Sequence, residues 1–259
     1  MLLAVDIGNT NITLGIFRVS KGKILPKPIK VWRLNTNKTE SADKYGRKIL
    51  DLFDHNNINS ADIKAVAIAS VVPVLDPIFE DVSFKYLGRK AFFVDEKTSF
   101  IKMKYENLNE IGADRIADAV AAYHFYGGPA IVIDFGTATT FDCIDKNGVY
   151  LGGVIAPGPL ISAEALAKKT SKLPQVEVVK PKRAIGKSTV KGIQSGLYFG
   201  YVGLVKEILK RIRSEMDGNP KILATGGLAD LIVPEIKEVK KILPDLTLEG
   251  IRLVYQNSK

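Results

Sequence analysis

Two stretches of the sequence, placed about half a chain apart, nearly repeat each other. The first is the apolar run 2–5 followed by Asp6-Ile7-Gly8-Asn9-Thr10, and the second is the run 130–133 followed by Asp134-Phe135-Gly136-Thr137. Each predicts a buried strand that ends in a carboxylate and a glycine-containing turn. The duplication predicts two domains of similar fold, and two such turns suit the binding of one phosphorylated ligand from both sides.

The composition favours a globular protein of two domains. The chain has 259 residues, of which 46% are hydrophobic, and a single cysteine, Cys143. One cysteine excludes an intrachain disulfide and predicts a reducing, cytoplasmic setting, with Cys143 as a small core residue. The N-terminus lacks the basic segment of a signal peptide. The longest apolar stretch on a helical pattern, 197–205, is far shorter than the roughly 20 residues that span a bilayer, so no membrane association is expected.

The net charge of +9 is spread along the chain rather than concentrated in one segment. The densest clusters of basic residues are 181–183 and 237–241. A solvated surface explains them, and attraction of anionic substrates such as nucleotides is the functional alternative. Nucleic-acid binding is not expected, because no recognition motif accompanies the charge.

Hydrophobic periodicity and turn residues predict a mixed sheet covered by helices in each half of the chain. The boundary lies within 111–129, which gives an N-terminal domain over 1–115 and a C-terminal domain over 116–259. Helices are expected over 41–56, 111–126, 188–216 and 246–256. Two further helices are expected to begin at residue 73 and just after residues 157–159. The expected strands are 2–7, 12–19, 29–35, 64–69, 91–94, 130–135, 139–145, 149–156 and 221–225.

The helix expected over 188–216 carries Gly192, Gly196 and Gly200 on one face. Small residues on one face allow another backbone to approach closely, either in the core of the same domain or on a second subunit. Just before this helix, the segment 186–189 reads Gly-Lys-Ser-Thr, like the end of a P-loop. Pro181 occupies the place of the first P-loop glycine, so this segment is better explained as the start of the helix.

The turn at residues 6–10 has the chemistry of a phosphate site. Gly8 allows the backbone to approach a ligand, and successive N–H groups form a concavity that binds anions. Asp6 would be repelled by phosphate, so its expected role is to hold Mg²⁺, directly or through water. A third glycine-containing turn, 224–229, follows another strand and would admit a flat ring or a ribose.

The order of these three motifs resembles the two phosphate motifs and the adenosine motif of the acetate kinase, sugar kinase, actin and chaperone ATPase superfamily. Four motifs together narrow the resemblance to the type III pantothenate kinases, over nearly the whole chain from residue 2 to at least Thr225. They are the segments 6–11, 112–115 (Gly-Ala-Asp-Arg), 134–140 and 152–158 (Gly-Gly-Val-Ile-Ala-Pro-Gly).

The resemblance implies an α/β fold of two duplicated ribonuclease H-like (actin-like ATPase) domains. It also implies ATP-dependent phosphorylation of pantothenate, the first step of coenzyme A synthesis, by a homodimer. The cofactors would be Mg²⁺ and a monovalent cation, K⁺ or NH₄⁺, with Asp134 as the ligand of that cation. The implied ATP-binding residues are Asp6, Ile7, Gly8, Asn9, Thr10, Asn11, Ile12, Thr13, Thr137, Gly226 and Gly227. The implied substrate-binding residues are Tyr105, Gly112, Ala113, Asp114, Arg115 and Thr189.

The family pattern makes Asp114 the catalytic base, and the residue chemistry agrees. Phosphoryl transfer needs a carboxylate to take the proton of the attacking hydroxyl. Asp114 lies in the first turn of an expected helix, whose dipole favours the ionised form, and Arg115 could pair with a substrate carboxylate. The structural alternative is that Asp114 caps the helix and Arg115 is solvated. Asp118 is expected to be structural, and neither His55 nor His124 is expected to be catalytic.

Three other functions compete with a pantothenate kinase. A kinase for another hydroxylated acid is opposed by the segment 112–115 and by Tyr105. A catalytically reduced relative that acts as a transcriptional accessory factor is opposed by the intact set of Asp6, Asp114 and Asp134. An actin-like filament would need additional subdomains, for which the chain is too short.

Overall fold

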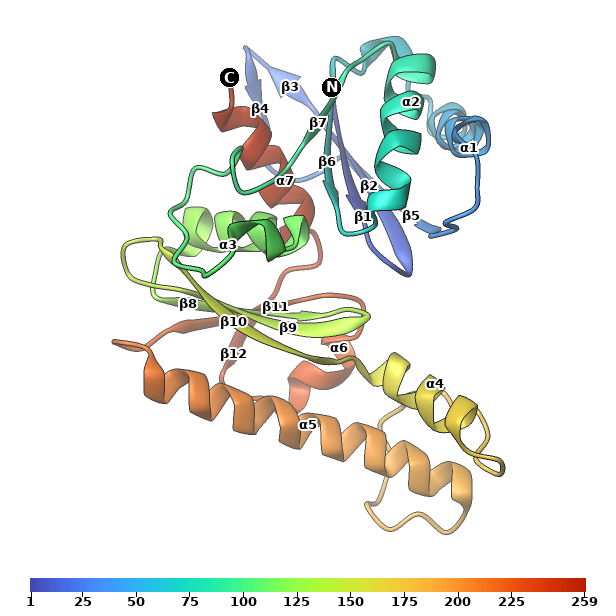
Figure 1. Cartoon of the computed structure of the whole chain (residues 1–259), viewed down its shortest axis with the longest axis vertical. Coiled ribbons are helices and arrows are strands. Elements are labelled where there is room, and N and C mark those ends of the chain that lie inside the picture. Colours follow the sequence, from blue (N-terminus) through green and yellow to red (C-terminus); the bar gives the residue numbers. More distant parts are fainter. The chain divides into compact units, whose positions relative to one another are not determined.

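The computed structural model describes all residues 1–259 and divides the chain into two compact units (Figure 1). Unit 1 contains residues 1–102, 106–124 and 245–259, and unit 2 contains residues 103–105 and 125–244. The sequence predicts a domain boundary between residues 115 and 116, and this position lies inside one continuous helix. Contacts instead place the division after His124 and add the last helix of the chain to unit 1.

The core of unit 1 is a five-stranded sheet in the order β5-β2-β1-β6-β7. The central strand β1 is antiparallel to β2 and parallel to β6. The strands of the unit are β1 (Leu2–Ile7), β2 (Asn11–Phe17), β3 (Val19–Ser20), β4 (Lys23–Ile24), β5 (Lys30–Asn35), β6 (Ala65–Ser70) and β7 (Ala91–Phe93). Its helices are α1 (Ala42–His55), α2 (Asp76–Leu87), most of α3 (Ala113–Tyr126) and α7 (Leu246–Asn257). Three short 3₁₀ helices, Ser60–Asp62, Pro73–Leu75 and Leu108–Glu110, connect them.

Helices cover both faces of this sheet. Alternate residues of β2, such as Leu14, pack with Ile49 of α1 and Phe79 of α2 in one apolar cluster. The residues between them face the other way, and a Cβ placed on Gly15 would lie 2.8 Å from Leu248 of α7. Figure 1 shows α1 and α2 on one side of the sheet and α7 on the other. Burial on both faces explains why β1 and β6 are almost entirely apolar.

Helices α3 and α7 are in direct contact although about half of the chain separates them. A Cβ on Gly250 of α7 would lie 2.0 Å from the carbonyl oxygen of Ala117, so the two backbones touch at this glycine. Thr247 donates a 2.8 Å hydrogen bond to the carboxylate of Asp118, which is 1% exposed. Asp118 therefore has the structural role that the sequence predicted.

Unit 2 repeats the topology of unit 1. Its sheet has the order β10-β9-β8-β11-β12, with β8 antiparallel to β9 and parallel to β11. The strands are β8 (Ala130–Phe135), β9 (Ala138–Ile144), β10 (Tyr150–Pro157), β11 (Lys221–Thr225) and β12 (Val239–Ile242). The helices are α4 (Pro159–Lys169), α5 (Thr189–Glu215), α6 (Ala229–Ile232) and the 3₁₀ helix Val233–Glu235. The duplication inferred from the sequence is therefore a duplication of the whole sheet.

Most of the predicted elements are confirmed to within one or two residues. Ser41 is the N-cap of α1, because its side chain accepts a hydrogen bond from the Lys44 amide. Cys143 is buried in the core of unit 2, as predicted. Three short strands were not predicted: β3 and β4, which form a hairpin, and the edge strand β12, which overlaps the basic cluster 237–241. No helix of the structure has the length and apolar character needed to cross a membrane.

Candidate active site

The first phosphate turn joins β1 to β2 in unit 1. Asp6 pairs with Thr13 and Ile7 with Ile12 in the hairpin register, so that the turn begins directly after Asp6-Ile7. The Gly8 amide donates a 3.0 Å hydrogen bond to the Asn11 carbonyl. A Cβ on Gly8 would lie only 3.0 Å from that carbonyl oxygen, so the tight turn favours glycine.

Two residues that the sequence analysis did not identify hold this turn. The Thr36 hydroxyl donates a 2.6 Å hydrogen bond to the Gly8 carbonyl, and the Thr36 amide donates to the Thr10 carbonyl. The Lys38 ammonium group donates a 3.0 Å hydrogen bond to the Asn9 side chain. Both residues follow β5, and the pairing of β5 with β2 brings them to this turn. Lys38 adds a positive charge at the turn.

The segment Gly112–Arg115 lies at the start of α3, in the same unit. The Arg115 amide donates a 2.7 Å hydrogen bond to Oδ1 of Asp114, so the carboxylate folds back over the first turn of the helix. A Cβ on Gly112 would lie 2.4 Å from this oxygen and 3.2 Å from Cγ1 of Val71. Val71 in turn donates its amide to the Ile7 carbonyl. Gly112 and the end of β1 are thus linked through Val71.

The Asp114 carboxyl differs from an ordinary aspartate in its pKa. Burial raises its pKa above the ordinary value for aspartate, and the Arg115 amide and guanidinium offset only part of this rise. The position of Asp114 in the first turn of α3 favours the ionised form, as the sequence indicated, but desolvation is the larger effect and the net pKa is raised. A carboxylate with a raised pKa is a stronger proton acceptor than an exposed aspartate.

Arg115 is buried, with 6% of its surface exposed, so the alternative of a solvated arginine is wrong. His55 is exposed and its Nδ1 lies 2.6 Å from the Asp51 carbonyl on α1. His124 lies in the last turn of α3, at the opposite end of the helix from Asp114.

The second phosphate turn, Gly136-Thr137, joins β8 to β9 in unit 2. Gly158, the last residue of the motif 152–158, packs directly on it. The Gly158 amide donates a 3.0 Å hydrogen bond to the Thr137 carbonyl, and a Cβ on Gly158 would lie 2.2 Å from the same oxygen. The close packing of Gly158 therefore fixes the backbone of this turn.

The third motif lies beside Asp134. Strands β8 and β11 are parallel with Asp134 opposite Thr225, so that Gly226 follows at the level of the second turn. Gly226 has a φ of +94°, and a Cβ there would lie 2.3 Å from Oδ1 of Asp134. The structure thus places Gly226 directly against Asp134, two residues before the second turn.

The two remaining predicted residues also lie in unit 2. Tyr105 is half-buried and its ring lies against β10. Thr189 is the exposed first residue of α5. Ser188 caps α5 by accepting a hydrogen bond from the Lys191 amide, which confirms that 186–189 is a helix start and not a P-loop.

The carboxylates of Asp6 and Asp134 are the type of ligand that Mg²⁺ and a monovalent cation require. No group of three or more histidine, cysteine, aspartate or glutamate side chains could hold a metal ion by itself. Mg²⁺ is usually held by one or two carboxylates together with substrate phosphates, which fits Asp6 beside a phosphate turn. Asp134 offers a single carboxylate beside glycine backbone, a donor set of oxygen atoms that suits a monovalent cation.

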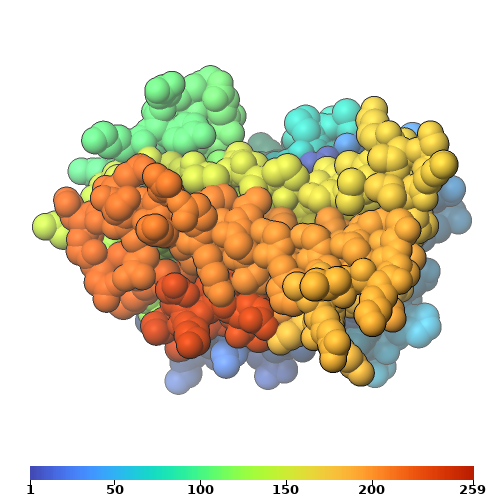
Figure 2. Space-filling model, turned by 90° about the horizontal axis from the view of Figure 1, so that it is seen from below, coloured from blue at the N-terminus to red at the C-terminus, as the bar shows by residue number.

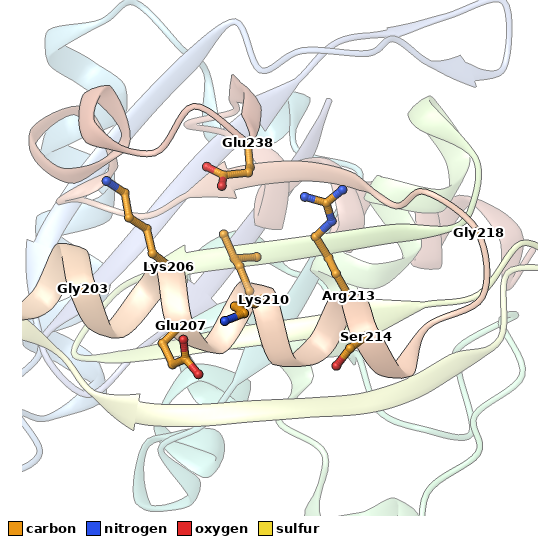
Figure 3. Close-up of a pocket in the computed structure, with 9 residues that line it drawn as sticks. Gly203, Lys206, Glu207, Lys210, Arg213, Ser214, Gly218 and Glu238 are labelled. Carbon is orange, nitrogen blue, oxygen red and sulfur yellow. The ribbon is translucent and has the colours of Figure 1, made fainter.

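A pocket of about 580 Å³ lies elsewhere in unit 2, along the C-terminal half of α5 (Figure 3). Its charged lining residues are Lys206, Glu207, Lys210, Arg213 and Glu238. None of the predicted ATP-binding, substrate-binding or metal-binding residues lines it, so it is not the candidate active site.

The duplicated sheets, each with a glycine turn at the end of its central strand, define a protein of the actin-like ATPase fold. Solved structures of low identity share this fold. A protein from Campylobacter jejuni described as a conserved Baf family transcriptional activator matches with a TM-score of 0.61 and 19% identity, over 98% of each chain. An inorganic polyphosphate/ATP-glucomannokinase from Arthrobacter matches with a TM-score of 0.50 and 16% identity, over 97% of this chain and 96% of its own.

The family is defined by closer similarity. Residues 2–211 match the family model described as type III pantothenate kinase. A type III pantothenate kinase from Endomicrobium trichonymphae is 51% identical over 257 residues, which cover 99% of each chain. The chain belongs to the type III pantothenate kinase family, and it is an enzyme of the kinase class.

Proposed function

We propose that the chain transfers the γ-phosphoryl group of ATP to the primary hydroxyl of pantothenate, giving 4′-phosphopantothenate, the first step of coenzyme A synthesis. The observation that carries the proposal is the Asp114 carboxylate at the start of α3, with a raised pKa, in a chain that belongs to this family. A protein that only binds a nucleotide has no need of a proton acceptor there.

In this proposal Asp114 accepts the proton of the pantothenate hydroxyl as the hydroxyl oxygen bonds to the γ-phosphorus. The bond from the γ-phosphorus to the bridging oxygen breaks, and ADP leaves with that electron pair. Asp6–Thr13, Thr137 and Gly226-Gly227 bind the phosphate and adenosine parts of ATP. Asp6 would hold the Mg²⁺ bound with ATP, directly or through water, and the ion would supply charge neutralisation of the phosphates.

Pantothenate is bound by Tyr105, Gly112–Arg115 and Thr189 in the same proposal. The planar guanidinium of Arg115 pairs with the pantothenate carboxylate. Burial of Arg115 supports this role, because an ion pair is stronger where water is excluded. Asp134 is the ligand of a monovalent cation, K⁺ or NH₄⁺, and the close approach of Gly226 fixes the position of its carboxylate.

The protein works as a homodimer in the cytoplasm, with no nucleic-acid or membrane partner. The glycine stripe of α5, defined as Gly192, Gly196 and Gly200, supports the dimer. All three glycines are exposed, and a Cβ on any of them would meet nothing within 4 Å, so packing in the core of unit 2 is excluded. Figure 2 shows α5, in orange, on the molecular surface.

Unit 2 also exposes several large apolar side chains. Ile155 on β10 is 61% exposed, Leu160 on α4 is 52% exposed and Phe199 on α5 is 38% exposed. Such apolar surface favours association with another copy of the chain. Sedimentation equilibrium should therefore give a dimer for the wild type and a monomer for Gly196→Glu, while a wild type that stays monomeric at micromolar concentration would contradict the dimer.

The alternative of a transcriptional accessory factor is not favoured. The similarity to the Campylobacter protein is low and concerns the fold alone, whereas the relative at 51% identity is a kinase by name.

The test is ADP release from the purified protein with MgATP and pantothenate, with and without K⁺. We expect turnover that depends on pantothenate and K⁺, and a loss of about 10²- to 10⁴-fold in Asp114→Asn, as expected when a general base is removed. Asp54→Asn, an exposed aspartate on α1, is the matched control and should keep full activity. Absence of turnover in the wild type with every monovalent cation would overturn the proposal.

A further inference from the structure

Tyr105 is held against the edge strand of the sheet of unit 2. Met103 forms an isolated parallel bridge with Tyr150, and the Lys104 amide donates a 2.8 Å hydrogen bond to the Tyr150 carbonyl. This short pairing to β10 fixes the backbone just before Tyr105. The direction of its side chain then depends on what the ring meets on β10.

The ring of Tyr105 meets two residues of β10. Its centroid lies 6.1 Å from the ring of Tyr150, with an angle of 46° between the rings. A Cβ on Gly152 would lie 3.4 Å from Cδ2 and Cε2 of Tyr105, so the ring lies over the bare backbone of this glycine. Gly152 has a φ of +106°, and the β9–β10 register shifts between Tyr150 and Gly152. The bulge thus presents both residues to Tyr105.

Tyr150 is itself fixed by a buried carboxylate. Its hydroxyl donates a 2.8 Å hydrogen bond to Oδ1 of Asp142 on β9, and Tyr150 and Asp142 are 1% and 0% exposed. The Thr140 hydroxyl lies 3.1 Å from Oδ2 of the same carboxylate. Thr140 is the partner of Asp134 in the β8–β9 register. A carboxylate that accepts two hydroxyl hydrogen bonds away from water strongly constrains both donors.

We infer that Asp142 and Tyr150 are positioning residues that hold Tyr105 in its substrate-binding orientation, with Gly152 as the surface on which the ring rests. The inference rests on the proposed function, in which Tyr105 contacts pantothenate. It gives a role to the Gly152-Gly153 part of the motif 152–158 and to the buried Asp142, which the reaction itself does not use. These residues should therefore affect the binding of pantothenate and not that of ATP, because none of them belongs to the ATP-binding turns.

The first test is the kinetics of Tyr150→Phe, which keeps the ring and removes only the hydroxyl. The KM for pantothenate should rise about tenfold, the size expected from loss of a hydrogen bond to a buried charge. The KM for ATP should stay within a factor of about two, because the glycine turns are unchanged. Asp142→Asn should shift the same constant in the same direction by a smaller factor, since its amide oxygen can still accept from Tyr150.

Tyr198→Phe is the matched control. Tyr198 is also a buried tyrosine of unit 2, and its hydroxyl lies 3.4 Å from the Leu231 carbonyl, away from Tyr105. This variant also removes one hydroxyl from a buried tyrosine of unit 2, and it should leave the KM for pantothenate unchanged. Equal changes in both variants, or a rise in the KM for ATP equal to that for pantothenate in Tyr150→Phe, would overturn the inference.

A second measurement does not depend on the reaction. Hydrogen exchange of the Lys104 amide and the ¹⁹F signal of 3-fluorotyrosine, assigned at position 105, report the order of the segment 103–105. In Tyr150→Phe the exchange should speed up and the signal should broaden, while Tyr198→Phe should match the wild type. If the order of the segment is lost without any change in the KM for pantothenate, the role of Tyr105 in the proposed function fails. If the order is kept, the inference about Tyr150 and Asp142 fails.

Discussion

At the scale of single residues, the raised pKa of Asp114 has consequences for activity. The base works only when ionised, so kcat/KM should fall as the pH drops through this raised pKa. The acid limb of the profile should therefore lie at higher pH than an ordinary aspartate would give. Initial rates measured over a range of pH at low pantothenate test this, and an acid limb at the usual pKa of a solvated aspartate would contradict it.

The same raised pKa has a consequence for stability. The folded state binds this proton more tightly than the unfolded state, so ionised Asp114 lowers the free energy of unfolding above the folded pKa. Asp114→Asn removes that cost, and the variant should melt at a higher temperature at neutral pH. Each kcal/mol gained corresponds to about 2–4 °C in a chain of this size. Thermal melts at neutral pH should show the gain, and at a pH well below the raised pKa the difference should shrink.

Lys38 provides a second prediction at this scale. Its ammonium group lies at the first phosphate turn, 3.0 Å from the Asn9 side chain, and it is exposed. Lys38→Gln should raise the KM for ATP about two- to fivefold, the effect of one exposed charge, and added salt should reduce the difference. Lys44→Gln on α1 is the control. An unchanged KM for ATP at low salt would exclude a role for Lys38.

At the scale of elements, the strand-to-turn units could be predicted because their signals are local. The runs that end at Asp6 and Asp134 are apolar strands followed by glycine turns, and the structure has both hairpins. The edge strand β12 could not be predicted from the sequence. It pairs with a single neighbour, β11, and the lysines of β12 are indistinguishable in the sequence from a solvated basic cluster. The roles of Thr36 and Lys38 depend on pairing between β2 and β5, which no single segment reveals.

The turn after β11 can be tested with a single methyl group. In Gly226→Ala the new Cβ would lie 2.3 Å from Oδ1 of Asp134 and 2.5 Å from the Phe135 amide nitrogen, so Asp134 must move. We expect a large loss of kcat/KM and a higher K⁺ concentration for half-activation. Gly88→Ala is the control, because its φ of +62° carries a similar backbone cost and no atom lies within 4 Å. If both variants lose the same activity, the clash with Asp134 is irrelevant.

At the scale of the whole molecule, the repeated sheet topology follows from the repeated motif, but the division into units does not. Helix α3 reads from the sequence as a bridge between two halves, since nothing local shows which core it joins. The tight approach of Gly250 to Ala117, and the hydrogen bond from Thr247 to Asp118, are contacts between segments far apart in the chain. Such contacts decide that α3 and α7 both complete unit 1.

The contact between α3 and α7 predicts opposite outcomes for the same substitution in two helices. Gly250→Ala should lower the free energy of unfolding by about 1–3 kcal/mol, because a Cβ would overlap the Ala117 backbone. In Gly203→Ala on α5 the new Cβ would meet no atom within 4 Å. This substitution should raise the free energy of unfolding by about 1 kcal/mol, because alanine has a higher helix propensity than glycine. Urea denaturation measures both. A stabilised Gly250→Ala would mean that α7 does not pack so closely.

The place of α7 in unit 1 also sets the order in which the protein can fold as it is synthesised. Unit 2, apart from three residues, is one continuous insertion between α3 and α7. At about 5–20 residues per second, the ribosome makes α7 roughly 6–24 s after α3, because about 120 residues lie between them. During that time the β1–β2 face that α7 covers is exposed, whereas unit 2 can already close. The half of the enzyme that emerges first is thus the last to be completed, and the nascent chain should need chaperone protection until α7 has left the ribosome.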